Sequence, residues 1–183
     1  MKTAFQTVDI WDVINPKFLS SYRYKKSLTS DGSYEASHPD LFLPDRQVYL
    51  DGTMQSTRKG NEAYHEALVH PGLLAHNNPR RVAIIGGGEG ATLREILKHN
   101  TVEHVKMIEI DEGMVETSRQ HLPDWNQCRD IVGSTPSCFD DPRAEILCED
   151  ALAWFINRFS SSKTSDMKQE ERFDVIIMDA LWV

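Results

Sequence analysis

The sequence contains no apolar run near the roughly 20 residues that a membrane-spanning helix needs. Its start, MKTAFQTVDIWDV, has Thr, Gln and Asp where a secretory signal peptide needs an apolar block. Cysteine is scarce, since only Cys128, Cys138 and Cys148 occur, and their spacing matches no zinc pattern. An odd number of cysteines also argues against a disulfide framework. We therefore expect a cytoplasmic protein with reduced thiols, no bound metal and no membrane partner.

Clustered basic residues are also lacking, which argues against a nucleic-acid partner. The net charge is −8, and it is unevenly distributed. Residues 1–100 carry 12 Lys and Arg against 11 Asp and Glu, whereas residues 101–183 carry 8 against 17. An acidic half suits a cationic ligand, although surface carboxylates also keep proteins soluble.

The 183 residues suit one domain with a small appendage, and their pattern predicts three segments. Residues 1–45 form a poorly periodic, poorly defined segment, with loop expected at Ser20-Ser21, from Ser27 to Ser37 and at 38–40. Residues 46–79 predict a hairpin over 46–56, turning at Asp51-Gly52, and a helix near 62–70 that Pro71 ends or kinks. Residues 80–183 form the third segment, in which apolar strands alternate with helical periods.

In this third segment, strands are expected at 80–85, 105–110 and 173–180, with a strand and turn at 144–150. Helices are expected at 91–100, 111–122 and 151–159, with loops at 123–143 and 160–172. Strand–helix alternation of this kind builds a parallel sheet with right-handed crossovers. The predicted fold class is α/β, Rossmann-like.

A glycine-rich turn, GGGEG at 86–90, follows the first of these strands and lets the backbone approach a ligand closely. Glu109 ends the next strand, 19 positions after Gly90, where a carboxylate can hold two ribose hydroxyls. With Glu89, Asp150 and Asp179, four carboxylates follow strand ends at one edge of the sheet. Each of them alone also suits a helix cap, but together they predict a nucleoside site.

The sequence of the glycine-rich turn argues against some classes of nucleotide ligand. It is neither the spaced GxGxxG of dinucleotide binders nor a phosphate loop, which needs a Lys and a hydroxyl. The carboxylate of Glu89 would repel a pyrophosphate and attract a cation. An adenosyl sulfonium therefore fits better than NAD.

Several segments resemble the polyamine aminopropyltransferases, the family of spermidine, spermine and thermospermine synthases. They are LDGTMQST (50–57), AYHEALVHPGLLAH (63–76), the run from Arg80 to Asp111, DDPRAEILCEDA (140–151) and FDVIIMDA (173–180). The Glu in GGGEG and the LVHPGLL segment are most similar to the thermospermine-synthase branch. The resemblance implies an S-adenosylmethionine-dependent-transferase fold without a prosthetic group, and homodimers in full-length members.

The implied reaction transfers the aminopropyl group of decarboxylated S-adenosylmethionine to putrescine or spermidine and releases methylthioadenosine. By the same resemblance, Asp179 is the catalytic base, Glu109 holds the ribose, and Glu89 holds the aminopropyl ammonium of the donor. Asp150 and Ala151 lie at the adenine end. The remaining donor residues are Gln55, Gly86, Gly87, Gly88 and Gly90. Tyr64, His65, Glu89 and Asp179 would bind the amine substrate.

The chain departs from the family pattern at two places. Gly60, Asn61 and Glu62 replace the usual Asp-Glu-Phe, and Trp182 stands where a second acidic residue is usual. The later strands of the family have no counterpart, so we expect a C-terminally incomplete aminopropyltransferase domain. Three alternatives stay open: a methyltransferase that uses intact S-adenosylmethionine, a non-catalytic polyamine-binding relative or heteromer subunit, and, more remotely, a dehydrogenase.

Overall fold

A computed structural model of the chain describes residues 1–14, 44–131, 133, 135–160 and 172–180. The chain divides into two compact units, one of Met1–Lys2 and Gln6–Gly60, the other of Thr3–Phe5 and Asn61–Val183. None of the helices in the described ranges is both long enough and apolar enough to cross a membrane.

The first unit is an antiparallel sheet of β1 (Val8–Val13), β2 (Asp45–Leu50) and β3 (Thr53–Thr57), in the order β1-β2-β3. The predicted hairpin is confirmed, because Asp51 and Gly52 both have positive φ, at 48° and 79°, as a tight two-residue turn requires. Strand β1 was not predicted within the poorly periodic residues 1–45. This strand has little apolar periodicity, and it forms by pairing with β2. The polar stretch from Ser27 to Ser37 lies outside the described residues.

The second unit begins with helix α4 (Asn61–Ala75), which runs through Pro71. We expected Pro71 to end or kink this helix. The helix does not end there, because it continues to Ala75. His65, Val69 and Leu73 are buried at four-residue spacing, so one face of the helix packs on the core along its whole length. This burial outweighs the hydrogen bond that a proline cannot make.

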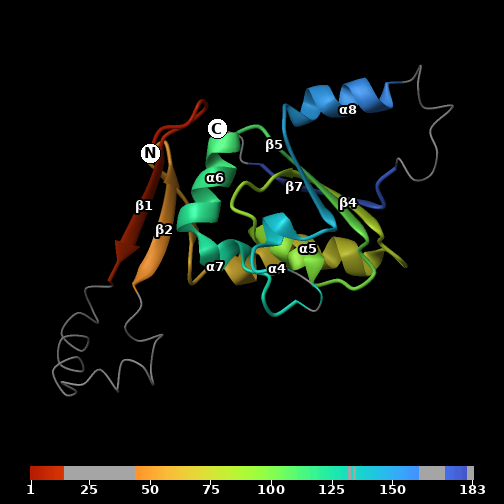
Figure 1. Cartoon of the computed structure of the whole chain (residues 1–183), viewed down its shortest axis with the longest axis horizontal. Coiled ribbons are helices and arrows are strands. Elements are labelled where there is room, and N and C mark those ends of the chain that lie inside the picture. Colours follow the sequence, from red (N-terminus) through yellow and green to blue (C-terminus); the bar gives the residue numbers. More distant parts are fainter. Residues whose placement is uncertain (15–43, 132, 134, 161–171, 181–183) are drawn as a thin grey trace. The chain divides into compact units, whose positions relative to one another are not determined.

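Four parallel strands form the predicted sheet: β4 (Arg81–Gly86), β5 (His104–Glu109), β6 (Ala144–Cys148) and β7 (Val175–Asp179) (Figure 1). Their spatial order is β6-β5-β4-β7, so the fourth strand pairs with the first. The chain adds β5 and then β6 on one side of β4, and it then places β7 on the other side of β4. Open α/β sheets bind ligands at such a switch point, outside the carboxyl ends of the strands.

Helix α5 (Ala91–Leu97) follows β4, α6 (Glu112–His121) follows β5, and α8 (Ala151–Phe159) follows β6. Figure 1 shows α8 on the opposite side of the sheet from α4 and α5. The main core lies on the α4 and α5 side, where Ile84, Met107 and Ile177 are buried. The predicted positions of these elements are confirmed. Most of the predicted connection at 160–172 lies outside the described residues.

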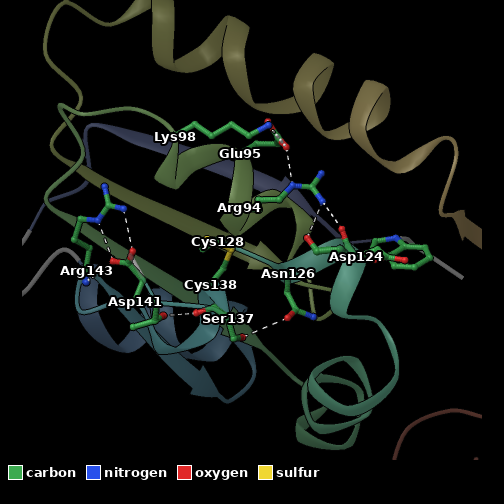
Figure 2. The surroundings of a disulfide bond; sticks show 12 residues. Arg94, Glu95, Lys98, Asp124, Asn126, Cys128, Ser137, Cys138, Asp141 and Arg143 are labelled. Atoms are coloured by element: carbon green, nitrogen blue, oxygen red, sulfur yellow. Dashed lines mark hydrogen bonds and ion pairs between the residues drawn. A yellow bond between two sulfur atoms is a disulfide. The ribbon is translucent and has the colours of Figure 1, made fainter. Parts of the chain in front are cut away.

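The expectation of a long loop over residues 123–143 holds only in part. The segment contains helix α7 (Pro123–Asn126) and a 3₁₀ turn, η1 (Cys138–Asp140). Cys128 and Cys138 form a disulfide (Figure 2). The backbone N–H of Cys128 donates to the Pro136 carbonyl, which brings the two cysteines together. The prediction of reduced thiols therefore holds only for Cys148, which is free and exposed.

Candidate functional site

The glycine turn at 86–90 has a backbone that other residues cannot adopt without strain. Gly86, Gly87 and Gly90 have φ values of 83°, 80° and 84°, in the left-handed region. A Cβ on Gly88 would lie 2.9 Å from Cγ of Met114 and 3.0 Å from Oε2 of Glu109. The turn therefore needs glycine both for conformation and for space.

Residues from the segment between β5 and β6 pack against this turn. A Cβ on Gly90 would lie 2.6 Å from Cζ of Phe139 and 2.7 Å from Cβ of Asn126. The η1 turn carries Phe139, and it begins at the disulfide-bonded Cys138. The glycine turn therefore depends on packing that the loop prediction for residues 123–143 did not contain.

Glu109 lies at the carboxyl end of β5, beside the turn. The backbone N–H of Gly88 donates to its Oε2 and that of Asp111 to its Oε1, both at 3.0 Å. Burial raises the pKa of Glu109 above its ordinary value, although these backbone hydrogen bonds oppose the rise. Each carboxylate oxygen has a second lone pair, so Glu109 can still accept hydrogen bonds from a ligand hydroxyl pair.

Asp179 ends β7 on the other side of the same turn. Its backbone oxygen accepts a hydrogen bond from the N–H of Gly87 at 3.0 Å. Its side-chain Oδ2 accepts one from Oγ1 of Thr92 at 2.6 Å. Main chain and side chain are thus both held by residues from the β4–α5 connection. Glu109 and Asp179 approach one glycine turn from two strands, as the sequence predicted for the sheet edge.

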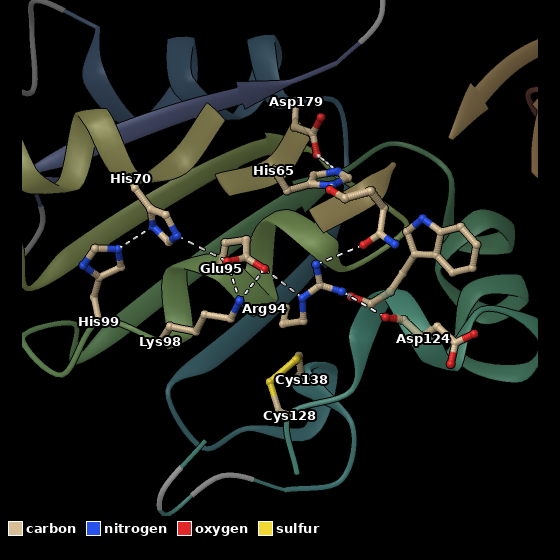
Figure 3. Close-up of polar contacts among 12 residues, drawn as sticks. His65, His70, Arg94, Glu95, Lys98, His99, Asp124, Cys128, Cys138 and Asp179 are labelled. Atoms are coloured by element: carbon tan, nitrogen blue, oxygen red, sulfur yellow. Dashed lines mark hydrogen bonds and ion pairs between the residues drawn. A yellow bond between two sulfur atoms is a disulfide. The ribbon is translucent and has the colours of Figure 1, made fainter. Parts of the chain in front are cut away.

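His65 lies 3.9 Å from Asp179, measured from Nε2 to Oδ2, and its side chain is buried (Figure 3). Its Nδ1 lies 2.5 Å from the carbonyl oxygen of Asn61. A carbonyl oxygen can only accept, so Nδ1 carries the proton of the neutral ring, and Nε2 presents a lone pair toward Asp179. Burial lowers the pKa of His65, which favours this neutral form.

Tyr64 is adjacent to His65 and half of its surface is exposed. Burial of its hydroxyl raises the pKa of Tyr64, and the negative charges of Asp179 and Glu89 raise it further. Tyr64 therefore stays a neutral phenol that can donate a hydrogen bond. The same interactions place Glu89 and Asp179 within electrostatic range of Tyr64, as expected for residues that share a site.

A buried network, absent from the sequence prediction, supports His65. Arg94 donates from Nη2 to Oδ1 of Asn61 at 2.9 Å, and from Nη1 to the carbonyls of Asp124 and Trp125, also at 2.9 Å. Figure 3 shows the Arg94 guanidinium between α5 and α7. Asn61 thus binds Arg94 through its side chain and His65 through its backbone carbonyl. No local pattern in the sequence singled out Thr92, Asn61 or Arg94. They are polar residues that flank the YHE and GGGEG motifs.

The remaining predicted residues have simpler surroundings. Asp150 caps helix α8, where its Oδ1 accepts a hydrogen bond from the N–H of Ala153 at 2.9 Å. Ala151 is the first residue of that helix. Gln55 lies on β3, in the other unit of the chain. The roles of Asp150, Ala151 and Gln55 toward a donor stay predictions.

The cluster of Glu66, His70 and Glu95 has the composition of a metal site, with ligand atoms within 4.8 Å of one another. Glu95, however, is already bound by two cations, Arg94 at 2.9 Å and Lys98 at 2.7 Å. Burial alone would raise the pKa of Glu95, but the hydrogen bonds from these cations outweigh it and lower the pKa. Ion pairing therefore accounts for this cluster.

Comparisons with known proteins agree with this geometry. Residues 61–182 match the family model described as the spermine/spermidine synthase domain. A polyamine aminopropyltransferase 1 from Hyperthermus butylicus is 46% identical over 134 residues, which cover 73% of this chain and 40% of the relative. The chain therefore spans less than half of that relative's length.

Two solved structures are also similar. The spermidine synthase from Thermotoga maritima matches with a TM-score of 0.65 and 32% identity, over 100% of this chain and 47% of that one. A spermidine synthase in complex with the transition-state analogue AdoDATO matches with a TM-score of 0.58 and 38% identity, over 74% of this chain and 39% of that one.

Proposed function

Because the chain belongs to the spermine/spermidine synthase family, we propose that it carries the nucleoside site and catalytic base of an aminopropyltransferase. The donor is decarboxylated S-adenosylmethionine, and the acceptor is a polyamine, putrescine or spermidine. The observation that carries the proposal is the placement of Glu109 and Asp179 on opposite sides of one glycine turn, each bound to its backbone. One carboxylate suits the ribose, and the other suits the reacting amine.

The donor end of the site follows from Glu109 and the turn. An ionised carboxylate accepts hydrogen bonds from both ribose hydroxyls, and such charge-assisted bonds are the strong kind. The glycines let the nucleoside approach the backbone. Glu89 holds the aminopropyl ammonium of the donor and disfavours the extra carboxylate of intact S-adenosylmethionine. Asp150 and Ala151 complete the donor site in this proposal.

In the reaction, the amine nitrogen attacks the methylene carbon next to sulfur. The carbon–sulfur bond breaks, its electron pair stays on sulfur, and methylthioadenosine leaves. The nitrogen loses one proton, which Asp179 accepts. A sulfonium is already an activated leaving group, so the main contribution of the protein is alignment of the two reactants.

Tyr64 and His65 complete the acceptor side. The neutral phenol of Tyr64 donates a hydrogen bond, and the Nε2 lone pair of His65 accepts one from the ammonium or amine N–H. His65 Nε2 lies 3.9 Å from Oδ2 of Asp179, so the two side chains border the same region. Two acceptor residues in one region suit a nitrogen with several N–H groups. For the whole protein we propose a homodimer in the cytoplasm, testable by light scattering and fractionation.

A donor-binding experiment separates this proposal from its main alternative, a methyltransferase, which would share the ribose carboxylate. Calorimetry on the chain should show tighter binding of decarboxylated S-adenosylmethionine and methylthioadenosine than of intact S-adenosylmethionine. Equal affinity, or a preference for the intact compound, would favour the methyltransferase and sink the proposal.

The base is tested by following methylthioadenosine release with putrescine and with spermidine. Any release should disappear in Asp179→Asn, because the amide cannot take the proton. Glu103→Gln is a matched control, since Glu103 is an exposed carboxylate paired with Arg80. Turnover that survives Asp179→Asn would refute the assigned base. We expect the chain to bind the nucleoside and to turn over polyamines very slowly or not at all, because it covers only 40% of the relative from Hyperthermus butylicus.

A further inference from the structure

We propose that Thr92 is the positioning residue for Asp179: its hydroxyl fixes Oδ2 of the carboxylate and so presents Oδ1 to the acceptor amine. This inference rests on the proposed function for the identity of the ligand, and on the structure for the contact itself. Thr92 lies in the first turn of α5, two residues after Gly90, and it is fully buried.

The hydroxyl of Thr92 bonds a residue that is distant in the sequence. Thr117, in the middle of α6, donates to the carbonyl of Gly113 four residues earlier at 2.6 Å. Thr92 is the second residue of α5, where no carbonyl of the same helix lies four residues earlier, and it donates to Oδ2 of Asp179 at 2.6 Å, across 87 residues of sequence. A hydrogen bond to a charged acceptor at this distance belongs to the strong class.

The other neighbours of Oδ2 also restrict that oxygen. A Cβ on Gly87 would lie 3.2 Å from it, so the turn backbone passes close by. His65 Nε2 stands 3.9 Å from it. The backbone oxygen of Asp179 is held separately by the N–H of Gly87. With the main chain and Oδ2 both fixed, the carboxylate has one orientation, and Oδ1 is the oxygen that meets the substrate.

A double-mutant cycle on the unfolding equilibrium tests the contact without any need for activity. The variants are Thr92→Val, Asp179→Ala and their combination in the full chain. Coupling of at least tenfold in the unfolding constant is expected, as for a hydrogen bond to a charged group. The matched control is Thr117→Val with Asp179→Ala, which should be additive. Additive behaviour of Thr92→Val would overturn the inference, whatever the activity of the chain.

Methylthioadenosine release with spermidine tests the positioning role. Thr92→Val should lower kcat about tenfold with the amine KM nearly unchanged, because Thr92 orients Asp179 and does not touch the amine. Thr92→Ser keeps the hydroxyl and should restore most of the rate. A purely packing role predicts the reverse order, since Val fills the space and Ser leaves a gap, and that order would overturn the inference. If the unaltered chain releases no methylthioadenosine, the double-mutant cycle decides the inference alone.

Discussion

A Cβ atom on Gly86 would lie 2.4 Å from the backbone oxygen of Asp179, a distance that real Cβ atoms do not show. The two residues are partners in the parallel pairing of β4 with β7. The end of β4 must therefore be glycine if β7 is to bring its terminal carboxylate beside the turn. The glycine run serves the position of Asp179 as well as the approach of a nucleoside.

Gly86→Ala should consequently be severely destabilising. It places a Cβ at φ 83°, which costs about 1–2 kcal/mol, and it adds a collision with a backbone atom that cannot move aside cheaply. Chemical denaturation should show a loss larger than the backbone term alone. Gly133→Ala is the control, because Gly133 has φ 81° and nothing within 4 Å of the added atom. Equal losses in the two variants would show that the approach of Asp179 contributes nothing.

Nucleoside affinity should depend on the ionisation of Glu109. Burial raises the pKa of Glu109 above the ordinary 4.5, and only the ionised form accepts both ribose hydroxyls. Calorimetry should therefore show methylthioadenosine binding tighten as pH rises from 4.5 through the raised pKa, and then level off. Glu109→Gln should weaken binding at neutral pH at least tenfold, for a loss of about 1.5–3 kcal/mol, and abolish this pH dependence. Glu112→Gln, an exposed neighbour, should do neither.

Ionisation of Glu109 should change the free energy of unfolding in the opposite direction from nucleoside affinity. Between 4.5 and its raised pKa, folded Glu109 holds more protons than the unfolded chain does, so its contribution to the free energy of unfolding falls as pH rises. A pH series of denaturation curves on the chain and on Glu109→Gln should isolate this contribution. If the free energy of unfolding of Glu109→Gln changes with pH in the same way as that of the unaltered chain, the result would contradict the buried position of Glu109.

His65 should make stability rise with pH. Burial lowers the pKa of His65 below 6.5, so the unfolded chain takes up a proton that the folded chain resists. The free energy of unfolding should fall as pH drops through 6.5 toward the lowered pKa, and His65→Gln should reduce that slope. Burial also lowers the pKa of His99 and of His104, so part of the slope will remain. The exposed His76, changed to Gln, serves as the control and should leave the slope in place.

Reduction of the Cys128–Cys138 disulfide should cost about 3 kcal/mol of unfolding free energy, the chain-entropy value for a loop with a separation of 10 residues. The comparison is between denaturation curves with and without a thiol reductant. Cys148→Ser should leave both curves unchanged, because that thiol is free. Reduction should also weaken methylthioadenosine binding, since Phe139 beside Cys138 packs under Gly90. An unfolding free energy that does not change when the reductant is added would contradict the Cys128–Cys138 disulfide.

Much of the fold follows from local patterns in the sequence. Buried strands such as Arg81–Gly86 are short apolar runs, and the helices that follow have apolar residues at helical spacing, so each element is specified within its own few residues. The Asp51-Gly52 turn is equally local, because it depends only on positive φ at two positions. Parallel pairing then brings the carboxyl ends of the strands to one edge. The order of elements along the sequence therefore predicts Glu109 and Asp179 at the same sheet edge as the glycine turn, whereas the pairing of β7 with β4 that brings Asp179 beside the turn is seen only in the structure.

Features that depend on contacts between distant residues could not be predicted in this way. Strand β1 exists through its pairing with β2, helix α4 passes Pro71 through burial of one face, and Cys128 meets Cys138 through a chain reversal. The hydrogen bond from Thr92 to Asp179 spans 87 residues. The proton on Nδ1 of His65 is set by one carbonyl. Local sequence determined the elements and the edge that carries the carboxylates, whereas packing decided which atoms of Asp179 and His65 face the site, because hydrogen-bond partners are chosen only once the chain is folded.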